Sequence, residues 1–520
     1  MSNNLSRRGF VKGAACGAAG ALAASMCGVV YASESEVTWD AEYDVVIAGY
    51  GATGAVAAIE AADQGAKVLL VEKAPEGREG GCSKVNQQLI TCTKDPEEFY
   101  AFWNFLRGGF SYPDDDLLRL YTDSAADNWA YLEYLGATPD DLDFHSRGAD
   151  IDGPGASSVY VTQVTSSYYM LLQANVEKRA ESIDVWFESP AVSLIQDPVT
   201  KEVQGLVVEK DGALLNIKSK GGVVLATGGF EANQKMVEAF MWCTDTGYYA
   251  SEYNTGDGVR MSMAAGADLV SMGIGNAFSW GYRAEGSRRG LSFNTKIRDM
   301  AIFVTGKGVR FYNERASARR SNLNYSGNWR VPIFPDSAYF ICDDNARATA
   351  PMFTSFSDDN MAEIEAGIII KADTIEDLAV AIDMDPETLA NTVATFNAAA
   401  TEDNDPFGRP AGRIIPITQA PFYAVKMSKY VTNTEGGPRR DQASRVIDTN
   451  GDPIPGLFAG GCLGCPNVGE DWNCGGNMSE SIVFGRILGA KTAALAKGED
   501  FDAAKPLEIP ACTFEIPDVE

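Results

Sequence analysis

Residues 43–72 read YDVVIAGYGATGAVAAIEAADQGAKVLLVE. The apolar run at 43–48 is typical of a strand that is buried on both faces, and the run at 68–71 is typical of a second such strand. The alanine-rich run between them, at 55–65, is typical of a helix that packs closely on a sheet. A strand, a glycine-rich turn, a helix and a second strand within about 30 residues predict a βαβ unit, and therefore a parallel sheet.

The turn between the first strand and the helix has the spacing Gly49-x-Gly51-x-x-Gly54. The first glycine permits a tight turn, the second lets the backbone approach a pyrophosphate, and the third lets the helix pack on the strand. The helix N-terminus then faces the anion, and Glu72 at the end of the second strand can accept hydrogen bonds from ribose hydroxyls. We therefore assign to a dinucleotide site the residues Gly49, Gly51, Ala52, Gly54, Glu72 and Lys73.

Two more glycine turns follow buried strands later in the chain. The first, VLATGGF at 224–230, lets a second strand end approach the same dinucleotide and favours FAD over NAD. In the second, IPGLFAGG at 454–461, we expect an edge strand that leads into a glycine turn and then into a helix over 479–497. The N-terminus of that helix can stabilise negative charge on a reduced flavin. These turns add to the predicted FAD site the residues Ala226, Thr227, Gly228, Gly461, Cys462, Asn477, Met478 and Ile482.

Together with shorter motifs, these turns resemble those of a known family. The shorter motifs include GGCSK at 80–84, TGDG at 255–258, RFYNE at 310–314 and TEGG at 434–437. Their order is that of the FAD flavoprotein subunits of the fumarate reductase/succinate dehydrogenase family, and the chain resembles the exported soluble reductases of that family most. The resemblance implies further FAD contacts from Gly81, Cys82, Ser83 and Asp257. Since no histidine lies near the GGCSK motif, we expect non-covalent FAD.

The resemblance covers residues 43–495 and implies a two-part architecture. We expect an α/β fold with a doubly wound, Rossmann-like FAD domain over residues 40–267 and 429–497, into which an α+β capping domain over 268–428 is inserted. Closure of the cap would exclude water from substrate at the flavin. Residues 498–520 are expected to form a poorly structured tail.

The chain departs from the family at the positions that decide the substrate. Members that handle fumarate hold the dicarboxylate with a histidine before the Thr-x-Gly-Gly turn, a second histidine early in the cap, and an arginine before the final Gly-Gly. Here these positions are Asn433, Asn276, and either Trp472 or Asn473, and the single histidine of the chain, His145, is distant from all of them in sequence. Because a buried carboxylate needs charge-assisted donors, we expect that fumarate is not the acceptor.

The proton donor that the resemblance implies is an arginine shortly after the RFYNE motif. Counted without gaps, that position is Ala318, and a shift of one residue would make Arg319 the acid. An arginine can act as an acid only if a neighbour lowers its very high pKa, so a tyrosine is the alternative, either Tyr325 or Tyr430.

Charge and the N-terminal segment indicate where the protein acts. The chain has 520 residues and a formal net charge of −28, which makes a nucleic-acid partner implausible. The sequence SRRGFVK at 6–12 is a twin-arginine pattern, the apolar run 13–30 follows it, and VYA at 30–32 is a candidate cleavage site. We therefore expect residues 1–32 to be an export signal, and the protein to act in the periplasm or at the outer face of the cell membrane.

The ten cysteines leave three alternatives open. Cys462, Cys465 and Cys474 lie in the segment expected to border the flavin, and Cys82 is expected nearby. Four thiolates could hold an iron–sulfur cluster, and a disulfide is an alternative in an oxidising compartment. Buried free thiols are the favoured alternative, and we assign no metal-binding residue.

The function expected from these observations is a two-electron oxidoreduction. We expect FAD-dependent reduction of an activated C=C bond of a small organic acceptor, in which the flavin gives a hydride to one carbon and the acid protonates the other. With one dinucleotide fingerprint and no CxxCH haem motif, the chain should receive electrons from a separate membrane or envelope donor. The alternatives are dehydrogenation of a ketone such as a 3-ketosteroid, on a related scaffold, and a non-catalytic electron-transfer flavoprotein.

Overall fold

The computed structural model describes residues 28–147, 153–311, 313–314, 323–325, 328–330, 335, 337–466, 475–502 and 507–517. The chain divides into two units. Unit 1 is formed by Met1–Met236, Ala250–Ile274 and Asn433–Glu520, and unit 2 by Val237–Tyr249 and Gly275–Thr432. The second unit therefore differs from the expected cap of residues 268–428, because it starts later in its main segment and also takes a short segment from before that boundary.

The central sheet of unit 1 has six strands in the order β24-β25-β12-β3-β4-β8. Their bounds are β24 Arg445–Ile447, β25 Pro453–Ala459, β12 Val223–Leu225, β3 Val45–Ala48, β4 Val68–Val71 and β8 Ile183–Trp186. From β25 to β8 all neighbouring strands are parallel, and only β24 is antiparallel. All residues of β3 and β4 are buried, as expected for a parallel sheet covered on both faces. The expectation that β25 is an edge strand is wrong, because β24 lies outside it.

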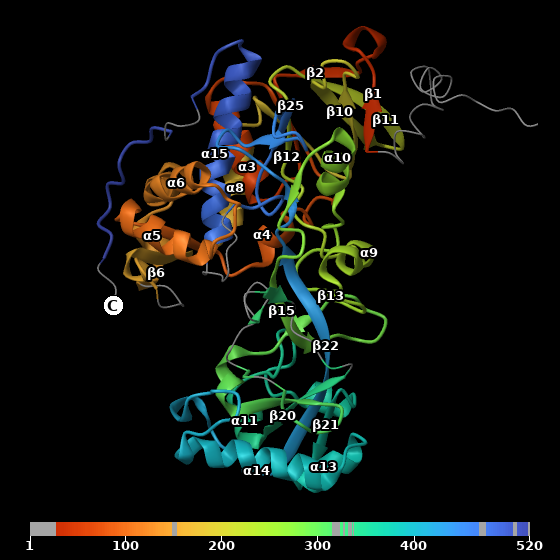
Figure 1. Ribbon diagram of the computed structural model, residues 1–520, viewed down its shortest axis with the longest axis vertical. Coiled ribbons are helices and arrows are strands. Elements are labelled where there is room, and N and C mark those ends of the chain that lie inside the picture. Colours follow the sequence, from red (N-terminus) through yellow and green to blue (C-terminus); the bar gives the residue numbers. More distant parts are fainter. Residues whose placement is uncertain are drawn as a thin grey trace, which may run out of the picture. The chain divides into compact units, whose positions relative to one another are not determined.

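Helices α3 (Ala52–Asp63) and α15 (Gly476–Ala496) pack against each other in unit 1, beside β12 and β25 (Figure 1). Small residues allow this close packing. A Cβ atom added to Gly489 would lie 2.4 Å from the carbonyl oxygen of Ala57, and one added to Gly485 would lie 2.7 Å from the Cβ of Val56. The other helices of unit 1 are α4 Gly81–Val85, α5 Pro96–Arg107, α6 Asp115–Ser124, α7 Asn128–Tyr134, α8 Tyr168–Glu177, α9 Gln234–Met236 and α10 Asp257–Ala265.

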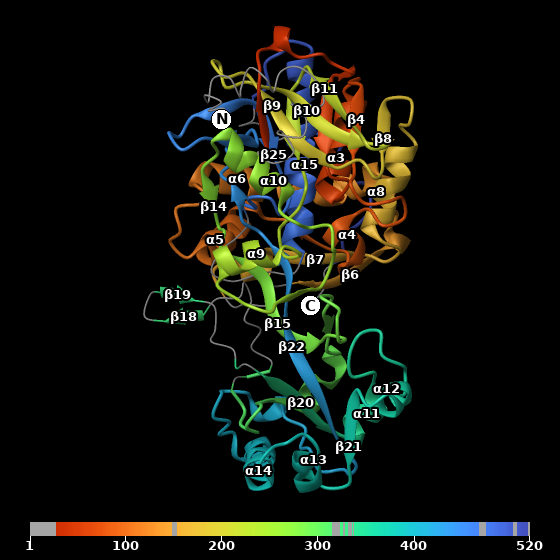
Figure 2. The same ribbon diagram turned by 90° about the vertical axis from the view of Figure 1, so that its right-hand side faces the viewer.

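Unit 1 contains a second sheet of five strands in the order β1-β9-β10-β11-β2, of which β9, β10 and β11 lie side by side in Figure 2. Their bounds are β1 Val29–Tyr31, β9 Ala191–Gln196, β10 Val203–Lys210, β11 Ala213–Ser219 and β2 Ala41–Tyr43. Of the expected signal at 1–32, residues 1–27 lie outside the described residues. The expected cleavage site falls in and just after β1, which pairs with β9 in parallel.

Shorter strands and an irregular C-terminal segment complete unit 1. The strands are β5 Leu89–Thr93, β6 Leu142–Arg147, β7 Val159–Val164, β14 Leu269–Val270 and β23 Gly437–Pro438. The segment 507–517, part of the expected tail, has no helix or strand and is anchored to the unit. Phe514 and Ile516 pack on the core, and Arg486 Nη2 donates a hydrogen bond to the carbonyl oxygen of Leu507 at 3.2 Å. Among the described residues, we find no helix with the length and apolar character needed to cross a membrane.

Unit 2 is built on a seven-stranded sheet whose main path is β16-β15-β22-β20-β17, with β13 and β21 paired to β22. The strands are β13 Gly247–Tyr248, β15 Gly275–Tyr282, β16 Leu291–Ser292, β17 Ala301–Thr305, β20 Ala338–Asp343, β21 Ile369–Ala372 and β22 Phe422–Thr434. The helices are α11 Asp344–Thr349, α12 Met361–Glu365, α13 Ile375–Ala381 and α14 Pro386–Glu402. Both faces of the sheet are covered, because alternate residues of β17 enter different cores. Ile302 belongs to the same buried cluster as Leu389 of α14, whereas Phe303 belongs to the cluster that contains Ala346 of α11.

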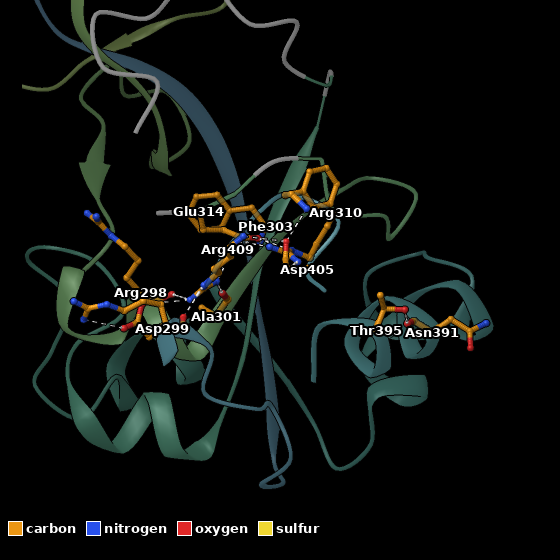
Figure 3. Close-up of polar contacts among 12 residues, drawn as sticks. Arg298, Asp299, Ala301, Phe303, Arg310, Glu314, Asn391, Thr395, Asp405 and Arg409 are labelled. Atoms are coloured by element: carbon orange, nitrogen blue, oxygen red, sulfur yellow. Dashed lines mark hydrogen bonds and ion pairs between the residues drawn. The ribbon is translucent and has the colours of Figure 1, made fainter. Parts of the chain in front are cut away.

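A buried network of charged side chains supports the core of unit 2 (Figure 3). Arg310 and Glu314, the first and last residues of the RFYNE motif, form a bidentate ion pair with distances of 2.9 and 2.7 Å. Arg310 Nη1 also donates to Asp405 at 2.6 Å, and Arg409 Nη1 donates to Glu314 at 3.1 Å. The Phe303 N–H donates to Glu314 Oε1 at 2.9 Å, so this one carboxylate connects two arginines to strand β17.

Candidate active site

The glycine turn between β3 and α3 brings backbone groups closer together than side chains would allow. Gly49 has a φ of +106°, and a Cβ atom added there would lie 2.4 Å from the carbonyl oxygen of Ala226. A Cβ atom on Gly54 would lie 1.9 Å from the carbonyl oxygen of Gly49. Gly51 differs, because the atom nearest to its added Cβ is Ser83 Oγ at 3.7 Å. Packing therefore requires the first and third glycines, whereas the second leaves the open backbone that a pyrophosphate needs.

Ser83 joins the short helix α4 to the N-terminus of α3. Its Oγ accepts a hydrogen bond from the N–H of Ala52 at 3.0 Å. This N–H is one of the groups at a helix start that have no partner within the helix. The N-terminus of the 12-residue helix α3 thus directs its N–H groups and the positive end of its dipole towards the turn, as a phosphate site requires.

Glu72 lies just past the end of β4, where the sequence predicts the ribose-binding acid. It is buried, and its two carboxylate oxygens accept hydrogen bonds from the N–H groups of Tyr50 at 2.9 Å and Ala74 at 2.8 Å. Burial raises its pKa above the usual range for a glutamate. Because each carboxylate oxygen can accept a second hydrogen bond, the group is held in place and still able to accept from ribose hydroxyls.

Lys73 and Asp257, predicted separately as FAD contacts, form an ion pair. Lys73 Nζ lies 2.5 Å from Asp257 Oδ2 and donates to Thr255 Oγ1 at 2.7 Å. Burial acts to raise the pKa of Asp257, but Lys73 and then Arg260 outweigh it and hold the pKa of Asp257 below its usual range. The pair joins the end of the βαβ unit to the start of α10.

Two buried oxygens in the predicted FAD site have no hydrogen-bond partner among the described residues. They are Thr227 Oγ1, after β12, and Asn477 Oδ1, at the start of α15. Buried polar atoms are normally paired, so each of them calls for a partner that the described residues do not supply. Gly228 follows Thr227, and Gly461 precedes Cys462, whose Sγ accepts a hydrogen bond from Asn477 Nδ2 at 3.8 Å. Both glycines have a positive φ, +70° and +73°. Together with the turn over α3, these features fit a dinucleotide with polar groups along its length.

A buried arginine fixes the loop that follows β25. Arg440 donates to the carbonyl oxygens of Ala459 and Gly464, both at 2.9 Å, and to Glu480 Oε1 at 2.8 Å. Glu480 Oε1 in turn accepts from the N–H of Gly461 at 3.2 Å. Arg440 and Glu480 could not be predicted to form this clamp from the sequence, because neither residue belongs to a motif of recognised spacing.

Asn433, predicted to contact substrate, lies among residues predicted to contact FAD. It is buried, and its Nδ2 donates to Glu435 Oε1 and to Cys462 Sγ, both at 3.5 Å. Asn477 Nδ2 donates to the same carboxyl oxygen of Glu435 at 2.8 Å. The position at which the resemblance expects a histidine is therefore occupied by an amide beside a carboxyl group and a thiol.

The structure places the other predicted substrate and catalytic residues only in part. Arg319, Trp472 and Asn473 lie outside the described residues. Tyr325 is the last residue of β18 (Leu323–Tyr325), which pairs with β19 (Asn328–Arg330), and Asn276 is in β15; only their backbones are described.

Tyr430 is a buried residue of β22 in unit 2. Its ring lies 5.8 Å from that of Tyr249, measured between centroids. A Cβ atom added to Gly281 would lie 2.5 Å from this ring, and one added to Gly290 would lie 2.7 Å from Tyr430 Cβ. Both glycines therefore make room for Tyr430, which gives the residue a packing role in addition to the proton transfer predicted for it.

The cysteines near the predicted flavin are not disulfide-bonded as far as the structure describes them. Cys82, Cys462 and Cys465 form no disulfide, and Cys474 lies outside the described residues. Within the described ranges, no three His, Cys, Asp or Glu side chains come together in a way that could hold a metal ion. Burial raises the pKa of each of these three thiols well above the usual range, so they are neutral.

Comparison with known proteins confirms the resemblance inferred from the motifs. Residues 44–470 match the family model described as FAD binding domain. The chain is 29% identical to a probable fumarate reductase of Shewanella frigidimarina, over 89% of this chain and 76% of that protein. It is 33% identical to an NADH:acrylate oxidoreductase of Vibrio harveyi over 55% of this chain, but spans only 28% of that longer protein.

Two further matches extend over almost the full length of the compared proteins. A digoxin reductase of Eggerthella lenta is 26% identical, over 96% of this chain and 99% of that protein. The crystal structure of a 3-ketosteroid delta1-dehydrogenase from Sterolibacterium denitrificans superposes with a TM-score of 0.74 over 87% of this chain and 99% of that chain, at 22% identity. The structural match confirms the expected fold, a mixed α/β flavoprotein fold with a capping domain.

Proposed function

The chain belongs to the FAD binding domain family, and from this membership we propose that it reduces the activated C=C bond of a small organic acceptor other than fumarate. The observation that carries the proposal is the surroundings of Asn433. Its amide lies beside Cys462 and Asn477 in the predicted flavin site, and its other neighbour is the carboxyl group of Glu435. Amide donors suit a neutral or singly charged acceptor, whereas a dicarboxylate needs cationic donors.

The roles proposed for the chain's own residues follow from their contacts. The N-terminus of α3 would hold the pyrophosphate of non-covalently bound FAD, and Glu72 would hold its ribose. When bound, FAD supplies the two electrons that reduce the double bond. Asn433 would orient the acceptor by donating a hydrogen bond to its carbonyl or carboxylate oxygen.

The proton donor is proposed from the sequence alone. Arg319 would protonate the second carbon, with Tyr325 or Tyr430 as the alternative. Arg319→Ala should then lower kcat by about 10²–10⁴-fold with flavin content unchanged, while Arg320→Ala should cost much less. Equal losses in the two variants, or abolition of turnover by Tyr325→Phe alone, would assign the acid to the tyrosine.

A separate redox protein of the cell envelope is proposed as the electron donor, and the twin-arginine route as the means of export. Support comes from the single dinucleotide fingerprint, the lack of a CxxCH motif and the SRRGFVK signal. The purified protein should show no turnover with NADH as sole reductant, and should turn over with an artificial low-potential donor. Efficient turnover with NADH would contradict the proposal.

The decisive experiment compares acceptors. Anaerobically reduced protein is mixed with fumarate, an aliphatic mono-acid alkene, an aromatic acrylate and an enone, and kcat/KM is measured for each. Fumarate should be the poorest of these acceptors.

Asn433→His should raise kcat/KM for fumarate relative to the mono-acids, whereas the control Asn433→Gln should not. A wild-type protein that prefers fumarate would refute the proposed acceptor class, and turnover of a saturated 3-ketosteroid with an artificial oxidant would favour dehydrogenation.

A further inference from the structure

Glu231 is a buried carboxyl group that no motif singles out. It follows the glycine turn after β12 and has no solvent-exposed surface. Its Oε1 accepts hydrogen bonds from Asn254 Nδ2 at 2.5 Å and from the Cys82 thiol at 3.3 Å. Its Oε2 accepts from the N–H and the hydroxyl of Thr434, at 3.2 and 3.1 Å. Four donors from three different parts of unit 1 therefore converge on this one carboxyl group.

All of these donors are neutral. No lysine or arginine among the described residues forms an ion pair with Glu231, and the thiols of Cys82 and Cys462 are titratable groups that interact with it. Burial raises the pKa of Glu231, whereas the hydrogen bonds from Asn254 and Thr434 favour the ionised form. Two opposing effects of this kind leave the protonation state sensitive to any further charge that arises nearby.

A single side chain, that of Asn254, separates Glu231 from the predicted flavin site. Asn254, which donates to Glu231, also donates to Cys82 Sγ at 3.1 Å. A Cβ atom added to Gly81 would lie 3.4 Å from Asn254 Oδ1, and one added to Gly228 would lie 3.3 Å from the same oxygen. The Asn254 side chain thus lies between Glu231 and two glycines that are predicted to contact FAD.

We infer that Glu231 is a proton-carrying residue of the flavin site, which takes up one proton for every two electrons that a redox partner delivers to bound FAD. The flavin itself takes up the second proton. Two electrons and two protons then enter the site together, and its net charge does not change. When the electrons pass to the acceptor, the double bond gains one hydride and one proton. The proton that Glu231 then releases replaces the one lost by the acid that protonates the carbon, and Glu231 returns to the carboxylate. The inference rests on the FAD binding of the proposed function and not on the identity of the acceptor.

The test is a spectroelectrochemical titration of the FAD-loaded protein, without acceptor, in which mediator dyes carry electrons from the electrode. For a two-electron couple, each coupled proton lowers the midpoint potential by about 30 mV per pH unit. Between about pH 7 and 9, the wild-type slope should be about twice the slope of Glu231→Gln, because the variant lacks the second proton. Glu231→Asp should restore the steeper slope. Glu79→Gln is the matched control, because Glu79 is also buried and forms an ion pair with Lys84 at 2.9 Å. Loss of the Glu79 carboxylate should leave the pH slope of the midpoint potential unchanged.

A second measurement needs no variant. The infrared difference spectrum of wild-type protein, reduced minus oxidised, should contain a carboxylic-acid C=O band that appears on reduction and shifts in D₂O. Equal pH slopes in wild type and Glu231→Gln would overturn the inference. If the variant does not fold, the absence of this band from the wild-type spectrum would overturn it. A protein without a flavin spectrum would instead refute FAD binding itself, so the two failures are distinguishable.

Discussion

At the scale of single residues, the ion pair between Arg440 and Glu480 is predicted to be critical for stability. Both side chains are buried, so Glu480→Gln would leave the guanidinium without its counter-charge. We expect the free energy of unfolding to fall by about 3–5 kcal/mol in a urea titration. The control is Asp441→Asn, which breaks the pair with the half-exposed Arg445 and should cost less than about 1 kcal/mol. Similar losses in both variants would contradict the role given to the buried pair.

Glu231 also gives a pH-dependence that can be measured on the apoprotein. Its pKa is raised in the folded state, so the unfolded chain ionises first as the pH increases. Its contribution to stability is therefore fully present below the unfolded pKa of about 4.3 and is lost as pH rises towards the folded pKa. The difference in Tm between Glu231→Gln and wild type should accordingly shift in favour of the variant as pH rises from acid to neutral. Parallel Tm curves would show that Glu231 does not titrate differently in the two states.

Residue roles could be predicted where a local motif fixes them. Glu72 was predicted from its spacing to Gly54, and the structure places it on the backbone of the same turn. Glu231 was missed because its partner Thr434 is 203 residues away in sequence, and no local pattern records such a contact. Arg319, Trp472 and Asn473 remain predictions, since they lie outside the described residues.

At the scale of elements, the close packing of α15 on α3 depends on Gly489. An alanine there would place its Cβ 2.4 Å from the backbone oxygen of Ala57, which cannot move without displacing α3. Overpacking of this kind typically costs about 1–3 kcal/mol. The matched control is Gly412→Ala, because nothing lies within 4 Å of its added Cβ, and the change should be neutral or stabilising by up to about 1 kcal/mol. Chemical denaturation of both variants measures the difference, and a neutral Gly489→Ala would show that the helices can move apart freely.

Element positions could be predicted better than their neighbours in the sheets. The helix expected over 479–497 is confirmed as α15. β25 was placed at the edge of its sheet because β24, with three residues, is too short to give a periodic signal. The boundary at 428 fell inside β22, since a continuous strand of 13 residues carries no signal of where one unit ends.

At the scale of the whole molecule, each unit has its own hydrophobic core, so the two should differ in their response to mutation. Glu314→Gln would remove the carboxylate that connects Arg310 and Arg409 in unit 2. We expect one calorimetric transition to move to lower temperature while the midpoint of flavin release, measured by fluorescence, stays in place. Arg413→Gln, a change in an exposed side chain 4.0 Å from Asp299, should move neither. Joint movement of both midpoints in Glu314→Gln would show that the units unfold as one.

The discontinuity of unit 1 has a consequence for the order of events during translation. The ribosome completes the chain of unit 2 at Thr432, whereas unit 1 still lacks its third segment, Asn433–Glu520. That segment supplies β25, which pairs with β12, and α15, which packs on α3. A nascent chain can therefore fold unit 2 first, whereas the predicted FAD site in unit 1 becomes complete only when nearly the whole polypeptide has been made. We therefore expect FAD to bind late in the synthesis of this protein, and the export proposed for the folded form would have to follow that binding.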